Sequence, residues 1–93
     1  MTTTDIGIDL GSSKTVIFSG AKIVLEQPSV ITVDAETLTP VYYGEKAQQT
    51  LGRTPDSLLC VHPVQNGIIA DYDLALEMLK KYMSDCFGKK IVR

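Results

Sequence analysis

Residues 6–15 read Ile-Gly-Ile-Asp-Leu-Gly-Ser-Ser-Lys-Thr, and this stretch decides how the chain begins to fold. Three apolar residues, Ile6, Ile8 and Leu10, alternate with small or acidic ones, which is the pattern of a strand with one buried face. Residues 11–14 are too few for a helix and lead into a β-branched and aromatic run at 15–18. The stretch therefore predicts a β-hairpin.

The turn of this hairpin has the composition of a phosphate-binding loop. A tight turn through Gly11, Ser12 and Ser13 can present successive backbone N–H groups and hydroxyls to one phosphate oxygen. Asp9 would repel a bare phosphate, but it could hold a hydrated Mg²⁺ that bridges to one. The alternative is a plain hairpin turn, which the local pattern alone favours. Neither the Walker A pattern nor the Rossmann fingerprint is present.

Further short strands and one short helix are expected in the middle of the chain. Strands are predicted at 23–25, 30–33, 41–43 and 58–61, and residues 26–28 are expected to interrupt the ladder because they end in proline. A helix is predicted from Glu45 to Leu51, closed by Gly52.

A longer amphipathic helix is expected from Asp71 onward. Asp71 and Asp73 suit a helix N-terminus, and Gly88 suits its end. Its apolar face is predicted to cover a sheet and to comprise Tyr72, Ala75, Leu76, Leu79, Tyr82, Met83 and Cys86. Residues 89–93 are expected to start another strand, so we interpret the chain as a truncated domain.

Composition excludes several classes of protein. With 93 residues the chain can form at most one small domain, and 44% hydrophobic and 22% charged residues are ordinary for a globular protein. No apolar run approaches the roughly 20 residues of a spanning helix, so a cytoplasmic location is predicted. The net charge of -2 gives no footprint for nucleic acid. Cys60 and Cys86 lack metal-ligand spacing and are expected to be free thiols.

Resemblance to a known family gives these segments a common meaning. Residues 6–15 resemble the first phosphate loop of the superfamily of actins, sugar kinases and heat-shock chaperones. Four further segments resemble the MreB family of bacterial actins in order and spacing. They are residues 23–30, 44–47, 51–55 and 63–71, which read IVLEQPSV, GEKA, LGRTP and PVQNGIIAD.

This resemblance implies a fold and a site. The fold would be α/β, part of a ribonuclease-H-like actin ATPase domain with a mixed sheet, a small inserted subdomain and a C-terminal amphipathic helix. Residues 1–30 and 68–93 would belong to subdomain IA and residues 31–67 to subdomain IB, with the second actin-like domain absent. Gly11, Ser12, Ser13 and Lys14 would line the phosphates of ATP, and Asp9 would hold Mg²⁺ indirectly.

The chain departs from the family pattern in two places. The family usually has Ala-Asn where this chain has Ser13-Lys14, and an arginine commonly precedes the proline where this chain has His62. Lys14 could contact a phosphate directly or point into solvent, and we favour the first. His62 is interpreted as an exposed loop residue because no nucleophile accompanies it in a recognisable motif. Packing is expected to account for Tyr42 and Tyr43, which alternate across a strand.

Three functions remain open at this point. The resemblance implies the amino-terminal part of a cell-shape-determining protein that binds ATP, hydrolyses it slowly and forms filaments, with the membrane and the cell-wall synthesis machinery as partners. The alternatives are a non-filament ATPase switch of the cell-division, pilus-assembly or chaperone type, and a fragment that is only a structural module. The chain alone is expected to lack ATPase activity and to form dimers or swapped oligomers through uncovered sheet edges.

Overall fold

The computed structural model describes residues 5–53 and 56–88, and it begins with the predicted hairpin. Strands β1 (Ile6–Leu10), β2 (Lys14–Ser19) and β3 (Lys22–Pro28) form an antiparallel sheet in the order β1-β2-β3. Ile8, Ile17 and Leu25 stand opposite one another across this sheet. They lie on its core-facing side, where Ile17 is fully buried. The hairpin is confirmed, but the predicted buried face of β1 is only partly so, because Leu10 packs against the core while Ile6 and Ile8 are 39% and 44% exposed.

Strand β3 is longer than the sequence indicated. The expected break at residues 26–28 is wrong, because Glu26 pairs with Val16, Gln27 with Thr15 and Pro28 with Lys14. Proline is tolerated here because it is the last residue of an edge strand, where a missing N–H removes no essential ladder bond.

A second antiparallel sheet follows, in the order β5-β4-β6. It consists of β4 (Ile31–Asp34), β5 (Pro40–Tyr43) and β6 (Leu58–Val61), close to the predicted bounds. Helix α1 (Glu45–Gln49) lies between β5 and β6 in the chain. It ends two residues earlier than predicted, because the Thr50 hydroxyl donates to the Ala47 carbonyl at 2.7 Å and closes the last turn.

A third, two-stranded sheet was not predicted. It is the short hairpin of β7 (Val64–Gln65) and β8 (Ile68–Ile69). Asn66 and Gly67 form its turn, with φ values of 53° and 77°. Two consecutive positive φ values are typical of a type I′ turn, for which Asn-Gly is the preferred sequence. The dipeptide was therefore a usable signal for this hairpin.

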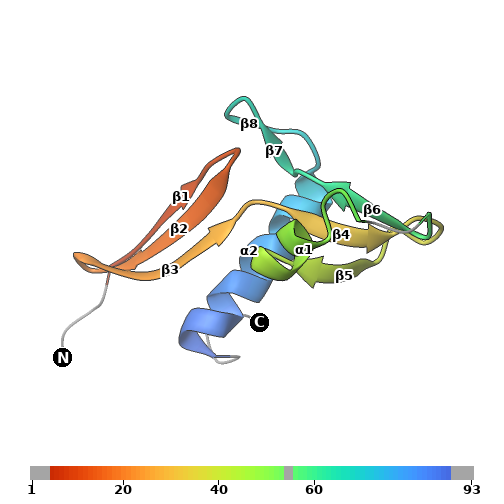
Figure 1. Ribbon diagram of the computed structural model, residues 1–93. Helices are drawn as coiled ribbons and strands as arrows, with labels where there is room; N and C mark the ends of the chain where they lie inside the picture. The colour runs from red at the N-terminus through yellow and green to blue at the C-terminus, as the bar shows by residue number, and fades with distance from the viewer. Residues whose placement is uncertain (1–4, 54–55, 89–93) are drawn as a thin grey trace.

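Helix α2 (Tyr72–Phe87) joins the first two sheets. Asp71 caps it, since its carboxylate accepts a hydrogen bond from the Leu74 N–H at 3.0 Å. Figure 1 shows the first sheet on one side, the second on the other, and α2 running between them, behind α1 and β4. The buried core combines side chains of both sheets and the helix, namely Ile17, Ile31, Val33, Met78 and Tyr82. One helix therefore supplies the packing that unites two small sheets.

The helix buries a narrower face than its sequence indicated. Ala75, Met78 and Tyr82 are its buried residues, and Met78 was not among those predicted. Leu74, Met83, Cys86 and Phe87 pack partly against this core. Tyr72 and Leu76, both predicted to be covered, are 71% and 44% exposed. The described elements therefore leave one edge of the apolar stripe uncovered.

The fold class is α/β, as expected, although the described strands do not form a mixed sheet. All strand pairs within residues 5–53 and 56–88 are antiparallel. The further strand expected at 89–93 lies outside the described residues. The helix stop at Gly88 is confirmed, because this residue has a φ of 80° and its N–H donates to the Ser84 carbonyl.

We predict that Tyr82→Phe destabilises the chain by about 1 kcal/mol. The Tyr82 hydroxyl donates to the Pro28 carbonyl at 2.6 Å, and its loss would leave that carbonyl without this partner. Urea unfolding would measure the change, with Tyr72→Phe on the same helix as the control. Equal effects of the two substitutions would contradict a specific role of the Tyr82 hydroxyl.

Candidate functional site

The loop at residues 11–14 is a tight turn closed by its own backbone. The Gly11 N–H donates to the Lys14 carbonyl at 3.0 Å. A Cβ atom at position 11 would lie 2.8 Å from that same carbonyl oxygen, so a larger residue would force the turn open. Glycine is thus required by the turn itself, whether or not a ligand binds.

Two backbone donors of this turn remain available. No residue within 5–53 or 56–88 accepts a hydrogen bond from the N–H of Ser12 or Ser13. Ser13 is exposed and Ser12 is partly exposed. Adjacent free N–H groups at a turn can bind an anion, as a phosphate-binding loop requires.

The Ser12 hydroxyl connects this turn to the β7–β8 hairpin. Its oxygen accepts a hydrogen bond from the Gly67 N–H at 2.9 Å, across 55 residues of sequence. A hydroxyl that accepts one bond still has its own O–H to donate. Ser12 can therefore keep its contact with Gly67 and donate to a phosphate oxygen as well.

A buried pair of hydroxyl groups holds the turn in place. Thr15 and Ser29 are both fully buried, and their side-chain oxygens lie 2.8 Å apart. The Ser29 N–H also donates to the Ser13 carbonyl at 3.0 Å. Because a buried hydroxyl without a partner costs free energy, this pairing fixes the position of residues 13–15 relative to residue 29.

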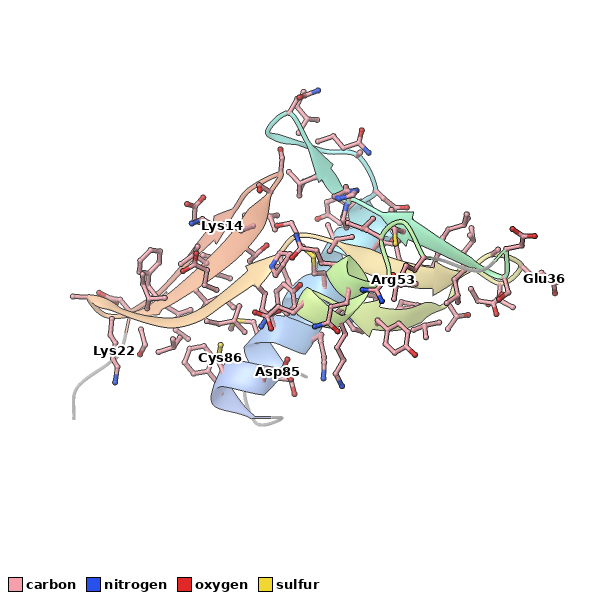
Figure 2. All side chains as sticks on the ribbon, in the orientation of Figure 1. Lys14, Lys22, Glu36, Arg53, Asp85 and Cys86 are labelled. Atoms are coloured by element: carbon pink, nitrogen blue, oxygen red, sulfur yellow. The ribbon has the colours of Figure 1, made fainter. Side chains whose placement is uncertain are left out.

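The charged residues of the site share the other face of the first sheet. Asp9, Val16 and Glu26 stand opposite one another across β1, β2 and β3. Lys14 lies two residues before Val16 in β2 and therefore on the same face. Its Nζ is 2.9 Å from a carboxylate oxygen of Glu26, with the two side chains 60% and 50% exposed. Figure 2 shows Lys14 on this sheet, far from Lys22.

Glu26 also changes the acid–base behaviour of Lys14. The hydrogen bond to Glu26 raises the pKa of the Lys14 amine most, and the negative charge of Glu26 raises it further; partial desolvation opposes this rise, and the charge of Asp9 adds the smallest contribution to it. The amine is therefore fully protonated near neutral pH. Neither of the two expected orientations describes Lys14 fully, because its ammonium group binds a carboxylate of β3.

The donor set suits Mg²⁺ held together with phosphates. Asp9 is exposed, and no cluster of three or more His, Cys, Asp or Glu residues occurs among the described residues. Mg²⁺ commonly binds one or two carboxylates, several waters and the phosphates of its ligand, so one carboxylate beside free N–H groups fits this ion. A metal cage made by protein alone would not fit.

The structure thus brings the five predicted site residues together in one hairpin, while three neighbours were missed. Asp9, Gly11, Ser12, Ser13 and Lys14 all lie in β1, β2 or the turn between them. Glu26, Ser29 and Gly67 were not predicted as neighbours of the site. The Asn66-Gly67 turn was a signal for the β7–β8 hairpin, but its contact with Ser12 depends on tertiary packing.

The structure also places the cysteines, the histidine and the tyrosine pair that the sequence analysis named. Cys60 and Cys86 are both partly buried and form no disulfide with each other. His62 is exposed, as predicted. Tyr43 packs against the core, whereas Tyr42 is 40% exposed, so packing accounts for only one of the two rings.

Comparison with known proteins agrees with the resemblance found in the sequence. A family model described as MreB/Mbl protein matches residues 3–93, which is nearly the whole chain. The chain belongs to the MreB/Mbl family. It is 40% identical over 81 residues to the cell shape-determining protein Mbl of Bacillus cereus, covering 86% of this chain and 24% of that protein. It is 32% identical over 98 aligned positions to MreB of Escherichia coli K12, covering 100% of this chain and 28% of that protein.

Solved MreB structures have the same fold. Crystal structures of Spiroplasma citri MreB5 bound to AMPPNP and to ADP superpose with TM-scores of 0.81 and 0.82. Both are 28% identical to this chain, and each match covers 90% of this chain and 26% of the MreB5 chain. This MreB/Mbl chain spans about a quarter of the length of the curated relatives it matches.

We predict that Ser12→Ala loosens the β7–β8 turn. Without the hydroxyl acceptor, the Gly67 N–H loses its partner at 2.9 Å, and its exchange with solvent should accelerate about five-fold or more, equivalent to about 1 kcal/mol. Hydrogen exchange followed by NMR would measure this. Ser13→Ala is the matched control, because the Ser13 contact with Ser29 uses a backbone carbonyl. Unchanged Gly67 exchange in Ser12→Ala would contradict the contact.

Proposed function

We propose that this chain is the amino-terminal part of a bacterial actin-like, cell-shape-determining protein that binds ATP and forms cytoskeletal filaments. The family membership and the names of its relatives support this proposal. The relatives' names favour it over the non-filament switches. ATP fits because solved MreB5 structures of the same fold are described as bound to AMPPNP and ADP.

The single observation that supports ATP binding is the pair of free N–H groups at Ser12 and Ser13, in the turn that follows the strand with the exposed Asp9. In this proposal the two N–H groups and the Ser12 hydroxyl bind phosphate oxygens, while Asp9 holds the waters of Mg²⁺. Gly11 keeps the turn tight enough to aim the donors in one direction. Mg²⁺ supplies charge neutralisation when bound, and Lys14 adds a positive charge at the edge.

The two larger sheets support the expected division into subdomains. We assign residues 1–30 and 68–93 to subdomain IA and residues 31–67 to subdomain IB, with β4, β5 and β6 in the inserted part. The backbone passes from one to the other after β3, where Ser29 is held by Ser13 and Thr15. The hairpin with the phosphate-binding turn would then lie in subdomain IA, next to this crossing.

Self-association and location complete the proposal. Within the described residues, β1 pairs only with β2, and Ile6 and Ile8 along it are 39% and 44% exposed. An exposed edge strand can pair with another chain, which supports dimers or swapped oligomers of the chain alone.

Neither described helix is long and apolar enough to cross a membrane. A cytoplasmic location, peripheral membrane association and contact with the cell-wall synthesis machinery stay predictions.

We predict that Asp9→Ala in the full-length parent protein weakens Mg-ATP binding at least ten-fold. Removal of the carboxylate leaves the bridging ion without its protein partner, and a charge-assisted contact is worth about 1.5 to 3 kcal/mol. Calorimetry with Mg-ATP would measure binding, and phosphate release would measure turnover. Asp5→Ala, just before the same strand, is the control. If both measurements matched the wild type, Asp9 would not be the metal residue.

We also predict that the 93-residue chain alone releases no measurable phosphate from Mg-ATP. Hydrolysis needs a positioned water and an enclosed cleft in addition to the donors of the turn, and those donors can contact the phosphates from one side only. Two or three hydrogen bonds barely offset the cost of immobilising a free ligand. Turnover by the purified chain that Asp9→Ala abolishes would show a complete site within these residues.

A further inference from the structure

The ion pair between Lys14 and Glu26 lies at the edge of the proposed phosphate site. Lys14 begins β2, one residue after the free N–H of Ser13, and its ammonium group lies 2.9 Å from Glu26 on β3. Both side chains are at least half exposed, so water screens the attraction between them. The pair is therefore strong enough to bias where Lys14 points and weak enough to open.

We propose that Glu26 is a specificity-determining residue that competes with bound phosphate for Lys14, so that it lowers the affinity of the site for polyphosphates more than for single phosphates. This inference rests on the proposed function, because it requires phosphate at residues 11–14. A ligand gains the contact of Lys14 only by outcompeting the carboxylate of Glu26. A chain of phosphates with three or more negative charges can do so, whereas a single phosphate gains less from the exchange.

Glu26 acts in a second way through its own charge. Glu26 and Asp9 are both acidic, and they lie on the same face of the sheet as Lys14. An incoming anion meets both carboxylates, and the ammonium group of Lys14 lies against one of them. A polyphosphate that carries Mg²⁺ brings a cation for Asp9, but the Glu26 carboxylate loses its own cation when Lys14 turns to the phosphates, so the charge of Glu26 still opposes binding.

The expected size of the effect follows from the exposure of the pair. Exposed ion pairs contribute little, and their loss corresponds to about a 1.5- to 5-fold change in an equilibrium constant. Glu26→Gln keeps the shape of the side chain and removes its charge. It should tighten binding of magnesium tripolyphosphate about 2- to 5-fold, with a smaller gain for inorganic phosphate.

The experiment is an NMR titration of the 93-residue chain with magnesium tripolyphosphate and, separately, with inorganic phosphate at fixed ionic strength. Weak binding suits this method, and the amide signals of Ser12 and Ser13 report on the site directly. Glu36→Gln is the charge-matched control, because Glu36 lies at the opposite end of the molecule (Figure 2). Lys22→Gln is the matched control for Lys14→Gln, since Lys22 is also an exposed lysine, at the start of β3.

The double variant Lys14→Gln/Glu26→Gln separates competition from simple charge removal. If Glu26 acts by holding Lys14, Glu26→Gln tightens tripolyphosphate binding in the wild-type background and has little effect once Lys14 is absent. An equal gain in both backgrounds, or the same gain in Glu36→Gln, would overturn the proposal. So would an equal gain for phosphate and tripolyphosphate.

The titration also distinguishes this inference from the proposed function. If the signals of Ser12 and Ser13 shift with tripolyphosphate but Glu26→Gln changes nothing, the phosphate site stands and the role of Glu26 fails. If these signals do not move at any concentration up to solubility, both proposals fail for this chain. Because Lys14 and Glu26 are exposed, the spectra of the variants should otherwise match the wild type and confirm that they fold.

Discussion

The hydrogen bond from the Tyr82 hydroxyl to the Pro28 carbonyl, 2.6 Å long, fixes the place where the chain leaves the first sheet for the second. Tyr82 lies on α2 and is buried in the hydrophobic core. Burial raises the pKa of its phenol, so the hydroxyl group stays protonated and can donate. Gly44 completes the contact, because a Cβ atom there would lie 2.9 Å from the Tyr82 hydroxyl oxygen. Helix α2, the segment that leads from β3 to β4, and the end of β5 in the second sheet therefore meet at one point.

The candidate site depends on the same crossing segment. Ser29 follows Pro28 and binds the turn through the Ser13 carbonyl and the Thr15 hydroxyl, while the Val30 carbonyl accepts the Gly44 N–H at 3.0 Å. Three consecutive residues therefore connect α2, the turn and the start of α1. A loop supported in this way loses little further freedom when it binds a ligand, which lowers the cost of binding.

The charges of Lys14 and Glu26 at the turn are a particular feature of this MreB/Mbl chain. A lysine at position 14 adds a cation to a turn whose other donors are backbone N–H groups and hydroxyls, and Glu26 restrains that cation. The chain spans about a quarter of the length of the relatives it matches. In the proposed function, the donors of this turn hold phosphate and metal.

The sequence by itself determined the local elements and the family. Alternation at Ile6, Ile8 and Leu10 determined the first strand, and Asp71 determined where α2 begins, because these signals act between residues close in the chain. Tertiary structure decided the extent of β3 through Pro28, the burial of Met78 and the exposure of Tyr72. It also decided the partners of Ser12, Ser13 and Lys14. These depend on strand register and on how α2 packs against two sheets, which local periodicity does not encode.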